Sequence, residues 1–328
     1  MKTNLEVKDM KIERKSNIMK IKRIGIGILS IVLLSGSGFA AENTESAGNL
    51  AMPLTQEGGT ARAMSMGSAV VGLPQGPASL FWNPAGLGRL DAGMELGLHH
   101  NFGLGSSIHE TAVAGMPWGT LGGFAASLNY VNNGTFEGRD SVGNLTGDYS
   151  AGDLGFALGW GRQWYYDISA GVAVKYNRQT LADKAYSAFA ADLGLLWNPL
   201  PLLNVGLTYS NLGTKVADSR MDSGLRVGAS YGVYKNILLA ASSELKPGGL
   251  DRLQLGAEGA VHPLVAIRAG YVLNLTDSNL EGLTGLTAGL GIKILKNVLF
   301  DYAYLPYGEL GASHRLSLTY KFASAENA

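Results

Sequence analysis

The chain has 328 residues, of which 46 are glycine and none is cysteine, and it carries 26 basic and 26 acidic side chains. A net charge of zero provides no basic surface for nucleic acid. The lack of cysteine excludes disulfides, thiolate metal sites and cysteine catalysis. Charged residues make up only 16% of the chain, which is low for a soluble protein of this size.

The N-terminus has the organisation of a secretory signal peptide. A polar, lysine-rich stretch, Met1–Lys22, precedes an uncharged apolar run, Ile24–Phe39. Gly38 and Ala40 then stand at the −3 and −1 positions of a cleavage site. The alternative is a transmembrane anchor, but the run is shorter than the ~20 residues that a spanning helix needs. It also contains four glycines, so we favour the signal peptide.

From about residue 93 onward the sequence repeats a period-two pattern. In Leu154–Trp160, LGFALGW, large apolar residues alternate with glycine and alanine, and Ile168–Tyr176 follows the same rule. Because successive strand side chains point to opposite faces, each strand has one apolar face and one small or polar face. The pattern predicts about fourteen strands. Their expected spans are 93–101, 108–116, 119–131, 148–162, 167–178, 185–198, 202–212, 222–234, 236–246, 249–262, 264–274, 283–295, 297–306 and 312–322.

The predicted connections alternate between tight turns and longer polar loops. Pro117–Gly119 and His262–Pro263 are tight, whereas Asn132–Asp148, Gln179–Lys184 and Gly213–Met221 are longer and more polar. Short turns at one end and long loops at the other are typical of outer-membrane barrels. The alternative, a soluble β-sandwich, would bury the apolar faces between two sheets.

Three observations favour the barrel over the sandwich: the secretory signal, the uninterrupted meander of hairpins, and aromatic residues near strand ends. These aromatics are Trp118, Trp160, Trp164, Trp197, Tyr231, Tyr234 and Tyr304. The fold expected is therefore an all-β, transmembrane, antiparallel up-and-down barrel. Its apolar faces would meet lipid, and its polar faces would line the lumen.

The expected lumenal faces carry charges of both signs. They are Arg226, Arg252, Glu258, Arg268, Lys293, Asp301 and Arg315. Two interpretations stay open for them. They pair with one another and with a plug, which we prefer, or they bind a substrate.

About fifty residues lie between the expected cleavage site and the first strand, and they are too apolar for a disordered linker. A barrel of about fourteen strands has a lumen that its own side chains do not fill. We therefore expect this segment to enter the lumen as a plug, or hatch. Within LFWNPAGL, Asn83–Pro84 starts a corner and Gly86 lets the chain turn back. Trp82 and Leu87 are expected to anchor the corner to the wall.

Two N-terminal stretches carry a family resemblance. The pairing of ARAMSMGSAVVG (Ala61–Gly72) with LFWNPAGL (Leu80–Leu87) resembles the PorV/PorQ group of FadL-like outer-membrane proteins. The ending GASHRLSLTYKF (Gly311–Phe322) is similar to the last strand of that group. The resemblance implies a fourteen-stranded barrel, with the Asn83-Pro84-Ala85 element in a lumenal hatch. The sequence departs from the group in two places: LPQGPAS lacks acidic residues, and ASAENA follows Phe322.

These features divide the sequence into four parts. Residues 1–40 are an N-terminal extension and signal peptide, with Met19 as the expected start of translation. Residues 41–91 form the hatch, 92–322 the barrel, and 323–328 a short tail. The hatch motif comprises Trp82, Asn83, Pro84, Ala85 and Gly86.

The sequence contains no convincing catalytic or metal-binding constellation. Gly228–Gly232 matches a nucleophile-elbow pattern, but it lies in an alternating strand with no helix after it. His314 and Ser317 are three residues apart on a strand and so face opposite sides. We therefore expect no enzyme activity, no cofactor and no catalytic or metal residues.

The sequence supports three hypotheses of function. The plugged barrel and its FadL resemblance imply passive outer-membrane transport of hydrophobic or amphipathic small molecules. The PorV/PorQ resemblance implies, alternatively, an accessory of type IX secretion that binds exported proteins through Asn132–Asp148 and Gly213–Met221. A purely structural outer-membrane protein is the third. Expected partners are outer-membrane lipid, a hydrophobic ligand, exported proteins and the barrel assembly machinery of a Gram-negative bacterium, but no nucleic acid.

Overall fold

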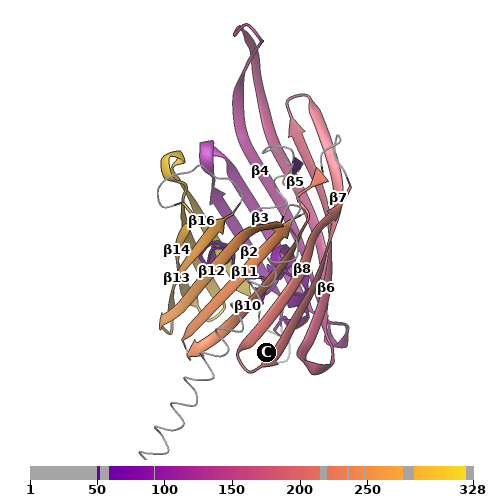
Figure 1. Ribbon diagram of the computed structural model, residues 1–328, viewed down its shortest axis with the longest axis vertical. Helices are drawn as coiled ribbons and strands as arrows, with labels where there is room; N and C mark the ends of the chain where they lie inside the picture. Colours follow the sequence, from indigo (N-terminus) through magenta and orange to yellow (C-terminus); the bar gives the residue numbers. More distant parts are fainter. Residues whose placement is uncertain are drawn as a thin grey trace, which may run out of the picture.

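The structure is a computed structural model that describes residues 50–51, 59–91, 93–214, 220–234, 236–246, 249–275 and 284–322. Within them, fourteen antiparallel strands close into a barrel, in which the last strand pairs with the first (Figure 1). The predicted fold class, an antiparallel barrel of about fourteen strands, is confirmed. The expected signal peptide (1–40) and the tail (323–328) lie outside the described residues.

The barrel strands follow one another around the wall in chain order. They are β2 (Glu95–Phe102), β3 (Ile108–Pro117), β4 (Gly123–Arg139), β5 (Leu145–Gln163), β6 (Ile168–Leu181), β7 (Lys184–Leu200), β8 (Leu203–Gly213), β10 (Gly224–Tyr234), β11 (Ile237–Lys246), β12 (Gly249–His262), β13 (Val265–Asn274), β14 (Leu286–Leu295), β15 (Val298–Pro306) and β16 (Ala312–Lys321). Two further short strands, β1 (Leu50–Ala51) and β9 (Arg220–Met221), pair in parallel. Among the described residues, no helix is long and apolar enough to cross a membrane.

The connection expected as a long loop at Asn132–Asp148 is a hairpin, so that prediction was wrong. β4 and β5 stay paired beyond an irregularity after Asn132, and they leave only a short turn at 140–144. The rings of Phe136 and Tyr149 stack across the two strands at 5.5 Å. Figure 1 shows this hairpin rising well above the rest of the barrel. The polar composition of the stretch suggested a loop, but cross-strand pairs outside a membrane need no apolar face.

The predicted loop at Gln179–Lys184 is also shorter than expected. β6 continues to Leu181 and β7 begins at Lys184, so only two residues connect them. In the third predicted loop, Gly213–Met221, the short strand β9 occupies the last two positions, and residues 215–219 lie outside the described part of the chain. We call the end of the barrel with these connections the hairpin end, and the opposite end the turn end.

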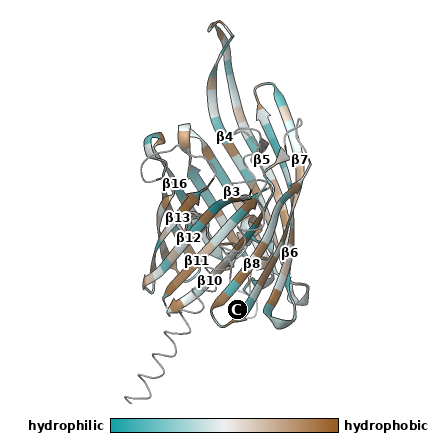
Figure 2. Cartoon of the chain, in the orientation of Figure 1, coloured by the Kyte–Doolittle hydropathy of each residue, from teal (hydrophilic) through white to brown (hydrophobic). Residues whose placement is uncertain are grey.

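The outer surface of the barrel is a belt of exposed apolar side chains. Leu128, Phe156, Leu158 and Leu193 are 44–53% exposed, whereas their small or polar neighbours along the strands point inward. In Figure 2 brown apolar segments are interspersed with pale and teal ones along the strands. So much contiguous apolar surface is unfavourable in water, and it is what lipid requires. Exposed tryptophans at the turn end, Trp118, Trp164 and Trp197, suit a membrane interface.

Residues 59–91, here called the lumenal segment, pack inside the barrel. They contain three short helices: α2 (Ala61–Ser65), α3 (Ser79–Trp82) and η2 (Pro84–Arg89). The segment contacts two regions of the wall, because α2 packs on β13–β16 and η2 on β5–β7. Its largest fully buried apolar side chains are Met66, Val70, Val71, Leu80 and Leu87. The lumenal segment therefore reaches across the lumen from one wall to the other.

Candidate functional site: the contact between the lumenal segment and the wall

Asn83 ties two parts of the lumenal segment to the barrel. Its Oδ1 accepts a hydrogen bond from the backbone N–H of Ala85 at 3.1 Å, which caps η2. Its Nδ2 donates to the carbonyl of Val71 at 2.9 Å and to that of Leu195, on β7, at 3.0 Å. Only a side chain with both an acceptor and two donors can make these bonds, which is why asparagine suits this position.

The rest of the predicted hatch motif surrounds this corner. Pro84 opens η2, and Ala85 behind it is fully buried. Gly86 lies so close to Ser79 that a Cβ there would overlap its hydroxyl. Trp82, expected to anchor the corner to the wall, belongs instead to a cluster within the lumenal segment, with Ala63 and Val70.

Leucines make the apolar contact with the wall. Leu80 and Leu87 are fully buried and pack against Val113, Ala157 and Ala173 on β3, β5 and β6. Leu87 was expected in this role, whereas Leu80 was not assigned one. Both leucines face small wall residues such as Ala157 and Ala173, which leave room for their side chains.

Glycines on the wall let the backbone of the lumenal segment approach closely. A Cβ at Gly171, on β6, would overlap the backbone of Pro84. A Cβ at Gly194, on β7, would overlap the Oδ1 of Asn83. The small lumenal residues seen in the sequence therefore do not widen an empty pore here, since they make space for a docked segment.

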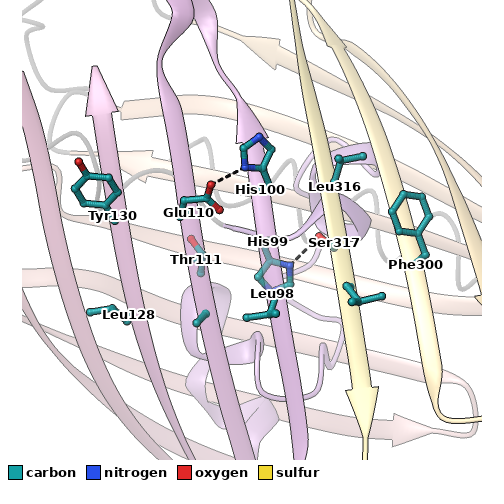
Figure 3. Close-up of a pocket in the computed structure, with 12 residues that line it drawn as sticks. Leu98, His99, His100, Glu110, Thr111, Leu128, Tyr130, Phe300, Leu316 and Ser317 are labelled. Carbon is teal, nitrogen blue, oxygen red and sulfur yellow. Dashed lines mark hydrogen bonds and ion pairs between the residues drawn. The ribbon is translucent and has the colours of Figure 1, made fainter. Parts of the chain in front are cut away.

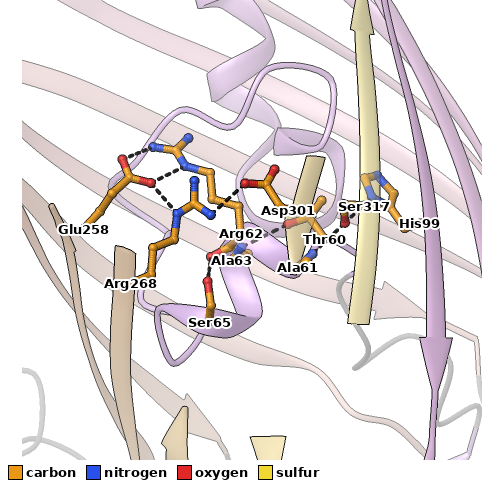
Figure 4. A network of polar contacts seen from close by, with 10 residues as sticks. All are labelled: Thr60, Ala61, Arg62, Ala63, Ser65, His99, Glu258, Arg268, Asp301 and Ser317. Carbon is orange, nitrogen blue, oxygen red and sulfur yellow. Dashed lines mark hydrogen bonds and ion pairs between the residues drawn. The ribbon is translucent and has the colours of Figure 1, made fainter. Parts of the chain in front are cut away.

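Ionic contacts hold the opposite side of the lumenal segment (Figure 4). Arg62, on α2, makes two parallel bonds of 2.9 Å to the carboxylate of Glu258, on β12. Arg268 bonds the same carboxylate at 2.6 Å and reaches Asp301 at 2.7 Å. Two-point guanidinium–carboxylate pairs fix orientation as well as contributing energy. The four side chains thus form one network that joins α2 to three strands.

The predicted lumenal charges fall into two groups. Glu258, Arg268 and Asp301 come together with Arg62. The sequence analysis assigned Arg62 no role, although it is the one charged residue in ARAMSMGS. The others lie apart from this network. Arg226 pairs with Glu244 at 3.1 Å, Arg252 lies 3.3 Å from Asp251, Arg315 is buried on β16, and Lys293 is exposed near the turn end.

Cavities remain beside the lumenal segment. One of about 380 Å³ runs along β2 and β16 towards the turn end. Its lining includes Gln75, Glu95, His99, Ser317 and Lys321. A second, of about 250 Å³, lies towards the hairpin end and is lined by polar residues such as Asn101, His109 and Asn133. Within the described residues, no group of three or more histidine or acidic side chains is placed to hold a metal ion.

A third hollow lies on the outer wall (Figure 3). It measures about 370 Å³, and its lining is mostly apolar, with Leu98, Leu128 and Leu316 among its residues. At its edge, His100 contacts Glu110 at 2.7 Å. The adjacent His99 points to the other side of β2, as the strand alternation predicted.

Comparison with known proteins identifies the fold. No protein-family model matches the sequence, and no curated protein matches it. Among solved structures, the toluene transporter TbuX of Ralstonia pickettii aligns with a TM-score of 0.58 at 14% identity, over 80% of this chain and 97% of its own. The chain shares the fold of this transporter.

Two further structures agree with this FadL-like fold. The toluene transporter TodX of Pseudomonas putida aligns with a TM-score of 0.57 at 14% identity, over 80% of this chain and 96% of its own. A FadL homologue of Pseudomonas aeruginosa gives 0.53 at 14% identity, over 88% of this chain and 100% of its own. Identities this low establish the fold, and the function has to be argued from the site.

Proposed function

We propose that this protein is an outer-membrane channel for passive entry of hydrophobic or amphipathic small molecules. The observation that carries the proposal is a lumen crossed by a segment docked on both sides, through Asn83 on one wall and Arg62 on the other. A barrel closed in this way is not an open, water-filled pore. The toluene transporters TbuX and TodX share the fold.

The proposed role fits the physics of the outer membrane. Apolar solutes cross its polar outer leaflet slowly, so a protein that passes them through the wall or lumen has a clear use. Short turns face the periplasm in such barrels and longer connections face outward. The turn end is then periplasmic, the hairpin end is extracellular, and residues 59–91 act as the hatch. Export would use the signal peptide expected at residues 1–40.

Mass spectrometry of small molecules extracted from the barrel, purified in mild detergent, tests the proposal. We expect an apolar molecule enriched over a detergent blank and over an unrelated barrel prepared in parallel. A double variant, Asn83→Ala with Pro84→Ala, should lose or change that molecule because it frees the corner. The absence of any enriched apolar molecule in repeated wild-type preparations would count against transport.

A second candidate, a secretion accessory of the PorV/PorQ type, is favoured by the hairpin of β4 and β5. Its tip exposes Val142 (81%) and Leu145 (64%) well beyond the barrel. Apolar side chains at an exposed tip suit contact with another protein. Affinity purification of the wild type and of a chain with residues 136–149 replaced by a Gly-Ser turn separates the candidates. Stoichiometric exported proteins bound only by the wild type would support the accessory role.

A further inference from the structure

The cavity beside the hatch has the size of a small-molecule site. Its volume of about 380 Å³ lies within the ~300–1,000 Å³ range of ligand pockets. The hatch supplies one side through Gln75 and Pro77, and the wall supplies the other through β2, β3 and β16. Apolar surface from Pro77, Val113 and Leu299 lies beside polar groups in this lining. An amphipathic molecule fits such a lining better than a pure hydrocarbon does.

His99 lines this cavity and carries an unused donor. Its ring is only 5% exposed, and its Nδ1 lies 2.8 Å from the hydroxyl of Ser317. That hydroxyl accepts the backbone N–H of Ala61 at 2.8 Å, so its own proton is available to Nδ1 (Figure 4). The ring proton of His99 is then on Nε2. Nε2 is buried and has no hydrogen-bond partner among the described residues.

Gln75 also lines this cavity and carries a second unused donor. It lies on the hatch, is 9% exposed, and anchors its backbone N–H to the hydroxyl of Ser79 at 3.0 Å. Its side-chain Nε2 is buried and, in the described part of the chain, makes no hydrogen bond. A buried N–H without an acceptor destabilises a fold, and such groups call for an explanation. Two of them, from independent elements lining one cavity, point to an acceptor that binds there.

The charges around the cavity decide which acceptor fits. Arg62 pairs with Glu258, Asp301 with Arg268, and Glu95 with Lys321 at 3.1 Å. The guanidinium of Arg89 is used elsewhere, on Ser169, Asn204 and the carbonyl of Asp167. A carboxylate entering the cavity would compete with groups already paired, whereas a neutral oxygen needs only the two free N–H donors.

We propose that this cavity binds small molecules bearing a neutral oxygen acceptor, such as a ketone, an ester or an alcohol. The oxygen accepts from Nε2 of His99 and from Nε2 of Gln75, while the apolar part packs on Pro77 and Val113. The inference rests on the proposed transport function and adds that, among the hydrophobic and amphipathic substrates, those with a neutral oxygen are bound in this cavity. Because the cavity lies on the periplasmic side, it is the site from which they leave.

Fluorine NMR titration of the purified full-length protein with 4-fluoroacetophenone tests this site. We expect saturable binding to the wild type, weakened about tenfold by His99→Phe and by Gln75→Leu, since each removes one donor. His99→Gln keeps an N–H and should retain part of the affinity. Matched controls are His314→Phe on the outer face and Gln254→Leu on β12, which lie outside the cavity and should bind as the wild type does.

A parallel titration with 4-fluorotoluene, which has no oxygen, separates this inference from the proposed function. Its binding should be the same in the wild type and in both cavity variants. Failure of 4-fluoroacetophenone to bind the wild type, or equal affinity in His99→Phe and Gln75→Leu, would overturn the site, since the donors then hold only water. If the wild type binds 4-fluoroacetophenone but neither 4-fluorotoluene nor any other apolar ligand, the proposed transport of hydrocarbons is contradicted instead, and the site stands.

Discussion

The side chain of Asn83 makes three hydrogen bonds at the corner of the lumenal segment. Its side-chain amide accepts from the backbone N–H of Ala85 and donates to two carbonyls, that of Val71 in the lumenal segment and that of Leu195 on the wall. The sequence motif indicated a turn at this residue, because asparagine before proline favours one. The motif did not indicate that the side chain of Asn83 donates to the carbonyls of Val71 and Leu195. Leu195 lies 112 positions away in the sequence, and only the closed barrel brings it near.

Asn83→Asp tests this assignment with almost no change in shape. Aspartate keeps the acceptor for Ala85 but sets an oxygen against the carbonyls of Val71 and Leu195. We expect the free energy of unfolding to fall by about 1–3 kcal/mol, measured by urea denaturation in detergent. Asn132→Asp, at an exposed position on β4, is the control and should be near neutral. An unchanged urea midpoint for Asn83→Asp would show that these bonds do not stabilise the corner.

Glu258→Gln tests the other anchor of the hatch. The substitution leaves the guanidinium groups of Arg62 and Arg268 facing a neutral amide, and removing one partner of a buried pair is destabilising. We expect trypsin to cleave after Arg62 faster than in the wild type, as followed by mass spectrometry of the peptides. Glu244→Gln breaks a comparable pair, with Arg226, away from the hatch. Equal cleavage rates after Arg62 in the two variants would contradict a holding role for Glu258.

At the scale of elements, the lumenal segment packs closely on β5–β7 because glycines on these strands have no side chain to keep its backbone away. Gly171→Ala would push a methyl group into the backbone of Pro84 and should lift η2 from the wall. We expect lower thermal stability and faster hydrogen exchange in residues 84–89 than in the wild type. Gly259→Ala is a matched control, because its Cβ would meet only a side-chain atom of Ile267 at 3.9 Å. Equal exchange at 84–89 in the two variants would argue against close docking.

The elements also show how far the sequence predicts this fold. All fourteen barrel strands were found because their alternation is local and continues along each strand, as in LGFALGW. The extension of β4 and β5 was missed because outside the lipid belt neither face has to be apolar. The contact of Arg62 with Glu258 was missed as well, since it joins residues 196 positions apart. The alternation predicts which side chains of a strand point outward and which point inward. It does not predict which residue of the lumenal segment contacts which strand.

At the scale of the whole molecule, the barrel has an apolar outer belt and a lumen crossed by the docked lumenal segment. The belt suits contact with lipid, and the lumenal segment occupies space that a wide, open pore would leave free. The structural neighbours with this fold include toluene transporters. The oxygen-acceptor cavity adds a polar contact on the periplasmic side, where an apolar solute that also carries a neutral oxygen would be bound more tightly than a pure hydrocarbon.

The most direct test of the central claim is the initial rate of labelled toluene uptake by intact Gram-negative cells. Three strains are compared: one with the gene, one without it, and the deletion strain complemented by the wild type, with labelled glycerol as a polar reference. The account predicts that deletion slows toluene uptake severalfold, that complementation restores it, and that glycerol uptake does not change. Equal toluene uptake in all three strains, or glycerol uptake that follows the gene, would contradict it.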